Sequence, residues 1–229
     1  MERNLMDKPV YLIGDPHNLW NKMWVLIDYW GIADCEIYCV GDMEIGLNSD
    51  PYETASALAR YDWAFSKRNI VFHSIRGNHD NPHFFDGTYQ YNNFKLLKDF
   101  TVLDINGLKT LFVGGGLSIN RSCLTAGVDY FLEELTPEIN IDALEKYDRI
   151  VSHDCPTFVN LHPNGLYDEE GNPVATDGLK QRTNIEKLVN CLQGDRPKWY
   201  YGHYHNSDYD VINGIVYRCV NILEIIPFD

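Results

Sequence analysis

The sequence is poor in positive charge, with 19 lysines and arginines against 33 aspartates and glutamates and a formal net charge of −14. Proteins that track long nucleic acids neutralise phosphates with clustered lysine and arginine. The one short basic pair here, Lys67-Arg68, is typical of a solvated helix end. We therefore expect no binding of long nucleic acid, and an anionic ligand would need another local source of positive charge, such as metal ions.

Long apolar runs are also missing. No stretch approaches the roughly 20 apolar residues that cross a bilayer, and the opening segment MERNLMDKPV has neither the apolar core nor the small-residue cleavage site of a signal peptide. The sequence thus predicts a soluble, cytoplasmic protein without membrane contact. Because 229 residues suit one α/β core, we expect a single domain over residues 1–229, in an oligomeric state that the sequence does not indicate.

Clustered cysteine is missing as well. The six cysteines are spread along the chain, and only Cys35 and Cys39 are close together. Without a signal peptide, reduced thiols are the expected state. A structural zinc site at Cys35 and Cys39 is a minor alternative, because no second pair of cysteine or histidine lies nearby to complete a tetrahedron.

What the chain does contain is an alternation of strand-like and helix-like runs. Apolar runs predict strands at residues 10–14, 36–40, 70–75, 149–152, 199–201 and, as a closing pair, 210–226. Helical spacing predicts helices near residues 20–27, 54–67, 142–146 and 182–192. The turn Asn106-Gly107 between residues 101–105 and 110–113 predicts a β-hairpin. An α/β fold of mixed sheets covered by helices follows.

Five short polar segments stand after these predicted strands: GDPH at 14–17, GD at 41–42, GNHD at 77–80, SH at 152–153 and GHYH at 202–205. Ligand sites in α/β architectures lie outside the carboxyl ends of strands. Carboxylate and imidazole together suit metals such as Mn, Fe, Zn or Ni. The candidate metal ligands are Asp15, His17, Asp42, Asn78, His153, His203 and His205.

The spacing of these ligands favours two ions. Asp15 and His17 are two residues apart, as are His203 and His205, so in extended backbone both side chains of each pair would point the same way. Such pairs could each hold one ion or straddle two ions about 3.5–4 Å apart. Seven side chains are more than one ion usually takes from a protein.

In order and type, the five segments resemble the signature of the calcineurin-like metallophosphoesterase superfamily, D-x-H, G-D, G-N-H-[DE], H and G-H-x-H. The resemblance implies two mixed β-sheets packed as a sandwich with helices on both outer faces. It also implies two metal sites, the first from Asp15, His17 and His205, the second from Asn78, His153 and His203, with Asp42 bridging both. His79 would be the catalytic histidine outside the ligand set, and Asp80 could orient its ring by hydrogen bonding.

A sixth segment, FVGGGLSINR at 112–121, resembles the G-G-A-x-S-x-D-[RK] stretch of small bacterial and phage-type members, with Gly116 and Asn120 in place of the usual Ala and Asp. Arg121 is therefore a candidate for substrate binding together with Asn78, although a surface arginine after a glycine turn is an equal alternative. The residues that follow Asp42, MEIG, differ from the G-D-x-x-D-R-G of protein Ser/Thr phosphatases, and this difference disfavours that branch.

The resemblance implies a dinuclear metal-dependent hydrolase of phosphomonoesters or phosphodiesters, here of a small nucleotide-like substrate, in which a hydroxide bridging both ions attacks phosphorus. Manganese is the first expected cofactor, with Fe, Zn, Ni or Mg as alternatives. Two dications and the carboxylates of Asp15 and Asp42 leave a formal charge of about +2, which attracts a phosphate ester. Phosphoprotein phosphatase and nuclease activities are the alternatives, and a non-catalytic scaffold is disfavoured because every ligand position is filled.

Three further expectations concern residues outside the ligand set. Trp20, Trp24 and Trp30 fall near one helical face, which predicts core positions rather than a platform for stacking bases. The pair Glu133-Glu134 is expected on the solvated surface. Tyr204, between two ligands, should point away from them in extended backbone.

Overall fold

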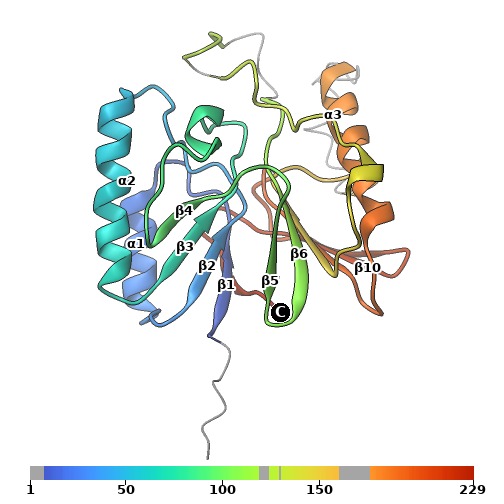
Figure 1. The fold of residues 1–229 in the computed structure, drawn as a ribbon, viewed down its shortest axis with the longest axis horizontal. Helices are drawn as coiled ribbons and strands as arrows, with labels where there is room; N and C mark the ends of the chain where they lie inside the picture. Colours follow the sequence, from blue (N-terminus) through green and yellow to red (C-terminus); the bar gives the residue numbers. More distant parts are fainter. Residues whose placement is uncertain (1–7, 119–123, 129, 160–175) are drawn as a thin grey trace, which may run out of the picture.

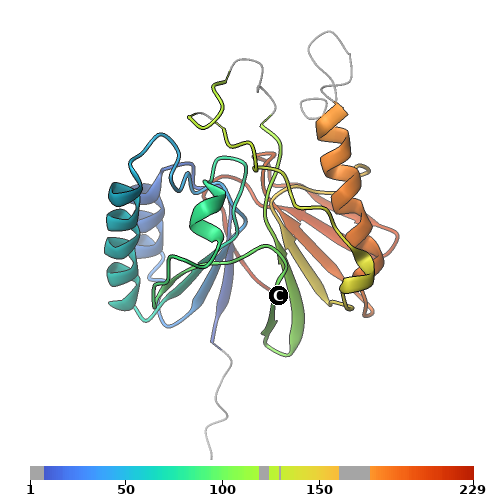
Figure 2. The same ribbon diagram turned by 45° about the horizontal axis from the view of Figure 1, so that its top comes forward.

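A computed structural model describes residues 8–118, 124–128, 130–159 and 176–229 of the chain. Within these residues two mixed β-sheets pack face to face, and helices cover the outer face of each sheet (Figures 1 and 2). The expected α/β sandwich is confirmed. No helix in the described part of the chain combines the length and the apolar character needed to cross a bilayer.

The first sheet has five strands in the order β11-β1-β2-β3-β4. Its parallel strands are β1 (Val10–Ile13), β2 (Glu36–Cys39), β3 (Val71–Ser74) and β4 (Phe94–Leu96). The remaining strand, β11 (Ile225–Pro227), runs antiparallel to β1. Helices α1 (Trp20–Tyr29) and α2 (Pro51–Ser66) pack on the outer face. Helix α2 begins where Asp50 caps two backbone N–H groups and Pro51 follows.

The second sheet has six strands in the order β5-β6-β7-β8-β10-β9. They are β5 (Thr101–Ile105), β6 (Leu108–Val113), β7 (Arg149–Ser152), β8 (Lys198–Tyr201), β10 (Ile215–Cys219) and β9 (Tyr209–Ile212). Strands β6, β7, β8 and β10 are parallel, and the two edge strands are antiparallel to their neighbours. Helix α3 (Thr176–Glu186) and the 3₁₀ helix η5 (Lys187–Cys191) cover the outer face.

The predicted hairpin between β5 and β6 is confirmed. Asn106 and Gly107 both have positive φ, 53° and 77°, as the mirror-image turn of a two-residue hairpin requires. Between the sheets, apolar side chains of both form a central layer that includes Leu12, Tyr38 and Phe112. The parallel strands of both sheets end at the same edge of the sandwich (Figure 1).

Some predicted elements were wrong in extent. Residues 142–146 do not form a helix; η3 (Ile141–Ala143) is one 3₁₀ turn without a buried residue, so no apolar face supports further turns. The helix expected at 182–192 starts earlier, as α3, and continues as η5. Another short 3₁₀ helix, η1 (Pro82–Phe85), follows the third polar segment.

The three tryptophans near α1 differ in burial. Trp20 is buried, Trp24 is partly buried against the core, and Trp30 is 67% exposed, so the core prediction was wrong for Trp30. The reason is that α1 ends at Tyr29 and the chain turns at Gly31, with φ of 62°, before a further helical turn can direct Trp30 inward.

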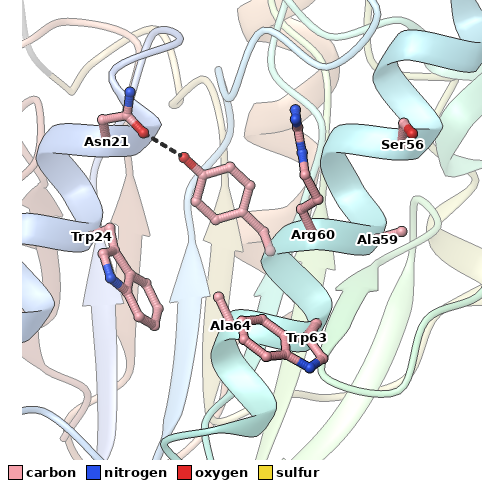
Figure 3. A pocket seen from close by; sticks show the side chains of 8 residues that line it. Asn21, Trp24, Ser56, Ala59, Arg60, Trp63 and Ala64 are labelled. Carbon is pink, nitrogen blue, oxygen red and sulfur yellow. Dashed lines mark hydrogen bonds between the residues drawn. The ribbon is translucent and has the colours of Figure 1, made fainter.

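A groove of about 800 Å³ lies on the outside of the molecule between α1 and α2 (Figure 3). Its lining residues are Asn21, Trp24, Ser56, Ala59, Arg60, Tyr61, Trp63 and Ala64. The Tyr61 hydroxyl donates a hydrogen bond to Asn21 Oδ1 at 3.2 Å across it. Because the lining contains no carboxylate or imidazole, this groove offers no metal-binding chemistry.

Candidate metal centre

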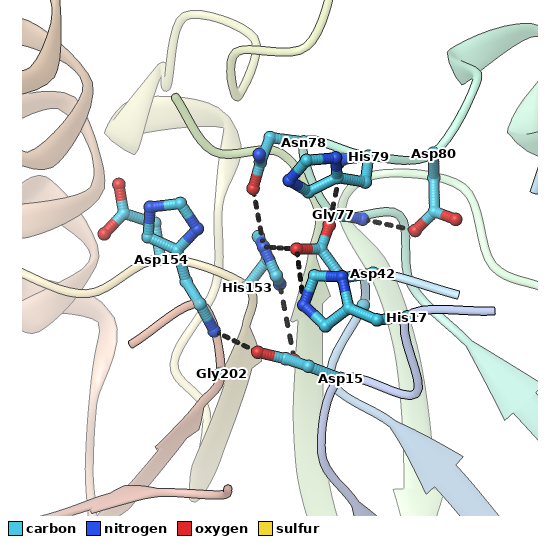
Figure 4. A network of polar contacts seen from close by, with 12 residues as sticks. Asp15, His17, Asp42, Gly77, Asn78, His79, Asp80, His153, Asp154 and Gly202 are labelled. Atoms are coloured by element: carbon cyan, nitrogen blue, oxygen red, sulfur yellow. Dashed lines mark hydrogen bonds and ion pairs between the residues drawn. The ribbon is translucent and has the colours of Figure 1, made fainter. Parts of the chain in front are cut away.

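The polar segments converge at the carboxyl ends of the parallel strands. Asp15 follows β1 and Asp42 follows β2 in the first sheet, while His153 follows β7 and His203 follows β8 in the second. Because both sets of strands end at the same edge, these side chains meet at that edge, where Figure 4 shows Asp15, Asp42 and His153.

Two groups of side chains have the geometry of a metal site. In the first, one ligand atom from each of Asp15, His17, Asp42 and His205 lies within 4.8 Å of every other. His17 Nε2 is 2.8 Å from His205 Nε2 and 3.6 Å from Asp42 Oδ2, and His205 Nε2 is 3.7 Å from Asp15 Oδ2. The nitrogens and carboxylate oxygens therefore face a common centre.

The second group consists of Asp42, His153 and His203, again with ligand atoms within 4.8 Å of one another. His153 Nε2 lies 3.3 Å from Asp42 Oδ2 and 3.0 Å from the Oδ1 of Asn78. All seven candidate ligands thus come together, and Asp42 belongs to both groups.

The backbone that presents these ligands is not extended. His17, His203 and His205 have φ of 42°, 67° and 53°, and Asp42 has 49°, all in the left-handed region. Both side chains of each pair were expected to point the same way along extended backbone, but His17, His203 and His205 do not have the extended backbone on which that expectation depends. The left-handed backbone turns N–H groups toward the carboxylates: His203 N donates to Asp15 Oδ2 at 2.6 Å. Non-glycine residues in this region are strained, and such strain gathers at functional sites.

At Gly77 the backbone of the loop after β3 passes very close to the Asp42 carboxylate. A Cβ at this position would lie 2.0 Å from Asp42 Oδ1, so only glycine allows the loop after β3 to pass beside the shared carboxylate. Because the loop passes so close, His79 N donates a hydrogen bond to Asp42 Oδ1 at 2.9 Å.

Hydrogen bonds to the far nitrogens orient the imidazoles. His153 Nδ1 lies 2.9 Å from the carbonyl oxygen of Val40, which can only accept, so Nδ1 carries a hydrogen and Nε2 faces the centre. His17 Nδ1 lies 3.3 Å from Glu44 Oε1. Glu44 therefore performs for His17 the task that the Val40 carbonyl performs for His153.

The crowded side chains shift one another's pKa values. Burial raises the pKa of Asp15 to about 7, and the charge of Asp42 adds to this effect. Burial also opposes ionisation of Asp42, but the charge and hydrogen bond of His153 outweigh it and hold the pKa of Asp42 well below its usual range. Asp42 in turn raises the pKa of His153 to about 10 against the effect of burial. Burial lowers the pKa values of His203 and His205 to about 4, leaving them neutral, as metal ligands must be.

These residues fit divalent metal ions. Asp15 Oδ1 is buried and has no hydrogen-bond partner among the described residues. An unsatisfied buried carboxylate oxygen is costly, and a cation would satisfy it. The donor set of carboxylate, imidazole and amide oxygen suits the borderline divalent metals.

The family model described as calcineurin-like phosphoesterase matches residues 8–207 of the chain. The chain belongs to the calcineurin-like phosphoesterase family. A search of curated proteins finds no match. As a calcineurin-like phosphoesterase it is a metal-dependent phosphoric ester hydrolase, and its two groups of Asp and His suggest divalent metal ions as cofactors.

The two candidate catalytic residues of this phosphoesterase have different surroundings. The His79 ring is partly exposed at the rim of the centre, with its centroid 5.4 Å from that of His17. Asp80 is fully buried and does not orient the His79 ring; its carboxylate accepts hydrogen bonds from the backbone N–H groups of Gly77, Ile45 and Met43. Asp80 thus joins the loops after β2 and β3.

Glu134 was wrongly expected on the solvated surface. It is completely buried, and its carboxylate accepts from Ser118 N at 2.9 Å and from Ser118 Oγ at 2.7 Å. Ser118 in turn contacts Asn78. No local sequence signal marks Glu134, because its partners come from distant loops and its neighbour Glu133 is exposed.

The other expectations have simpler outcomes. Tyr204 points away from the candidate metal centre of the phosphoesterase, and its hydroxyl donates a hydrogen bond to Asp154 Oδ1 at 2.6 Å. Cys35 and Cys39 are buried free thiols, and neither belongs to a potential metal group among the described residues. Arg121 lies outside the described residues, so its contact with substrate stays a prediction.

Glu44 provides a test of how the first group is held. Glu44→Gln should weaken Mn²⁺ binding about 10-fold, because a neutral amide accepts more weakly from His17 Nδ1 and leaves that ring less basic. Titration calorimetry with Mn²⁺ measures the change. The control Glu53→Gln alters an exposed carboxylate on α2 and should bind like wild type. Equal affinities of all three proteins would show that Glu44 does not support His17.

Proposed function

We propose that this phosphoesterase holds two divalent ions, manganese in the first instance, and hydrolyses the phosphomonoester or phosphodiester bond of a small nucleotide-like substrate. The observation that carries the proposal is the membership of Asp42 in both groups of ligands. One carboxylate between two ligand sets supports two neighbouring ions rather than one. A cytoplasmic location, expected from the sequence, is part of the proposal.

In this mechanism, Asp15, His17, Asp42 and His205 would hold one ion, and Asn78, Asp42, His153 and His203 the other. When bound, the ions neutralise the charge of the phosphate and make water acidic enough to act as a nucleophile near neutral pH. Asp42 is kept in position by the backbone N–H of His79, and His153 by the carbonyl of Val40. The ring of His79, at the open rim, donates a proton to the departing oxygen of the ester.

The small size of the proposed substrate rests on charge. The chain carries a formal net charge of −14, so a long polyanion would be repelled by most of the surface. A small phosphate ester needs to approach only the metal centre, where bound dications reverse the local sign. Phosphorylated proteins and nucleic acids are the competing substrates.

A substrate panel tests the proposal. The protein is incubated with Mn²⁺ or Ni²⁺ and with nucleoside monophosphates, cyclic nucleotides, dinucleoside phosphodiesters, a phosphopeptide and single-stranded DNA. Release of phosphate from the nucleoside monophosphates, or formation of nucleoside monophosphate from the cyclic nucleotides and dinucleoside phosphodiesters, is the expected result. Preferential turnover of the phosphopeptide or the DNA would show that the proposed substrate class is wrong. Absence of metal-dependent turnover of every ester in the panel would contradict the proposed chemistry.

Metal content is a separate prediction. After removal of metals with a chelator and dialysis against Mn²⁺, elemental analysis should find about two ions per chain, one for each ligand group. The reconstituted protein should also unfold at a higher temperature than the chelated one, by mass action of ions that bind only the folded state. A content of one ion or none would contradict the dinuclear part of the proposal.

A further inference from the structure

Asn78 differs from the other candidate ligands because its amide has two unlike ends. The oxygen can bind a metal ion, whereas the amino group has no free lone pair and can only donate hydrogen bonds. The two ends have nearly the same shape, so packing alone does not determine which of them faces the centre. Some polar neighbour must select the orientation.

The selecting neighbour is Ser118. Asn78 Nδ2 donates to Ser118 Oγ at 3.1 Å, and Asn78 Oδ1 lies on the other side, 3.0 Å from His153 Nε2. Both Asn78 and Ser118 are buried. A serine hydroxyl can donate or accept, so Ser118 selects the amide orientation only if its own hydrogen is committed elsewhere.

That hydrogen is committed to Glu134. Ser118 Oγ donates to Glu134 Oε2 at 2.7 Å, and Ser118 N donates to Glu134 Oε1 at 2.9 Å. An ionised carboxylate only accepts. With its hydrogen directed to Glu134, the hydroxyl presents a lone pair to Asn78, and the amino end of the amide must turn toward it.

The backbone around Glu134 is bound to the same region of the site. Its carbonyl oxygen accepts from Arg76 Nη1 at 2.8 Å and from Gly116 N at 3.1 Å. Arg76 precedes Asn78 by two residues and also pairs with Asp99 through Nη2 at 2.9 Å. Glu134 and Asn78 are therefore fixed to one rigid frame.

We propose that Ser118 and Glu134 are positioning residues that fix the Asn78 amide with its oxygen toward His153, and so complete the second metal site. The inference rests on the proposed function, because it assigns to Asn78 an ion in the second group. The orientation of the amide by Ser118 and Glu134 requires no change in the charge of any ligand. The polarity of the hydrogen bonds, from Asn78 through Ser118 to Glu134, is the physical basis.

Glu134→Gln is the sharpest variant, because it keeps the shape and reverses one hydrogen bond. Ser118 N can only donate, so the new amide oxygen turns toward it and the new amino group faces Ser118 Oγ. The hydroxyl then directs its own hydrogen to Asn78, whose oxygen turns away from the centre. The second Mn²⁺ should bind about 10–100-fold more weakly, the usual loss when the support of a ligand is removed.

Mn²⁺ titration followed by electron paramagnetic resonance measures this loss without an activity assay. Wild type should show the spectrum of a coupled ion pair, and Glu134→Gln, at the same Mn²⁺ concentration, that of an isolated ion. The matched control Glu133→Gln makes the same substitution at the exposed neighbouring residue and should resemble wild type. Ser118→Ala, which removes the selecting hydroxyl but keeps the backbone N–H to Glu134, should give a smaller loss and provides a second test if Glu134→Gln folds poorly.

A double variant separates amide orientation from general damage. Asp at position 78 has oxygen at both ends, so Asn78→Asp combined with Glu134→Gln should recover the coupled pair that Glu134→Gln alone has lost. Damage to packing would not be repaired in this way. Unchanged binding of both ions by Glu134→Gln and Ser118→Ala, or failure of the double variant to recover the pair, would overturn the inference. Fewer than two ions in wild type would instead contradict the proposed function.

Discussion

His79→Ala is expected to lower kcat by about 10²–10⁴-fold, the usual contribution of a positioned general acid, while the protein keeps its full metal content. Turnover and metal content should respond differently because the backbone and the ring of His79 have different roles. Its backbone N–H donates to Asp42 Oδ1 and remains in the alanine variant, whereas the ring that would protonate the leaving oxygen is lost. Steady-state kinetics together with elemental analysis measure both quantities on one preparation.

The choice of leaving group sharpens this prediction. Loss of a general acid should be small for an ester of p-nitrophenol, whose anion leaves readily, and large for an alkyl ester. His83→Ala, an exposed histidine four residues further on, is the matched control and should keep wild-type kinetics. Equal losses on both esters would argue against proton donation by His79, and loss of metal from His79→Ala would assign the residue to the metal site instead.

Asp42→Asn is expected to weaken the binding of both ions and to lower kcat/KM at limiting Mn²⁺ by at least about 10²-fold, more than the loss of a residue that only supports a ligand. One oxygen of the shared carboxylate becomes an amino group, and the negative charge between the two ligand groups disappears. Asparagine tolerates the left-handed backbone at this position, where φ is 49°, so the substitution should not disturb the loop.

Asp34→Asn is the matched control for this variant. Asp34 is also an aspartate with left-handed backbone, φ of 53°, but it is exposed and precedes β2, whereas Asp42 follows that strand. It should retain wild-type metal affinity and turnover. Full activity and unchanged Mn²⁺ affinity of Asp42→Asn would mean that the ions do not share this carboxylate, and that hydrolysis comes from elsewhere or from a contaminant.

The positions of the candidate ligands could be predicted from the sequence because each belongs to a polar segment that follows an apolar strand. Asp15, Asp42 and His153 stand within three residues of a strand end, and parallel strands that end together bring such residues together whatever the loops do. The mixed sheets and the hairpin at Asn106-Gly107 were predictable for the same reason, since they depend on local patterns.

The orientation of side chains within the site could not be predicted in this way. Asp80 was expected beside the His79 ring, yet its carboxylate turns inward to backbone N–H groups of two loops. Glu134 was expected in solvent, although it lies buried against Ser118. In both cases the decisive partner is a polar group brought near by tertiary packing, and no propensity or spacing in the sequence encodes that partner.

The metal centre joins the two halves of the sandwich. Asp15 and Asp42 follow strands of the five-stranded sheet, and His153 and His203 follow strands of the six-stranded one, while the layer between the sheets is apolar. An ion bound by residues from both sheets would therefore act as a cross-link between the sheets at that edge. Withdrawal of the ions would leave that edge joined by hydrogen bonds such as those from Arg76 to the Glu134 carbonyl and from His153 to the Val40 carbonyl, so the sheets should be held together less firmly at the end where catalysis takes place.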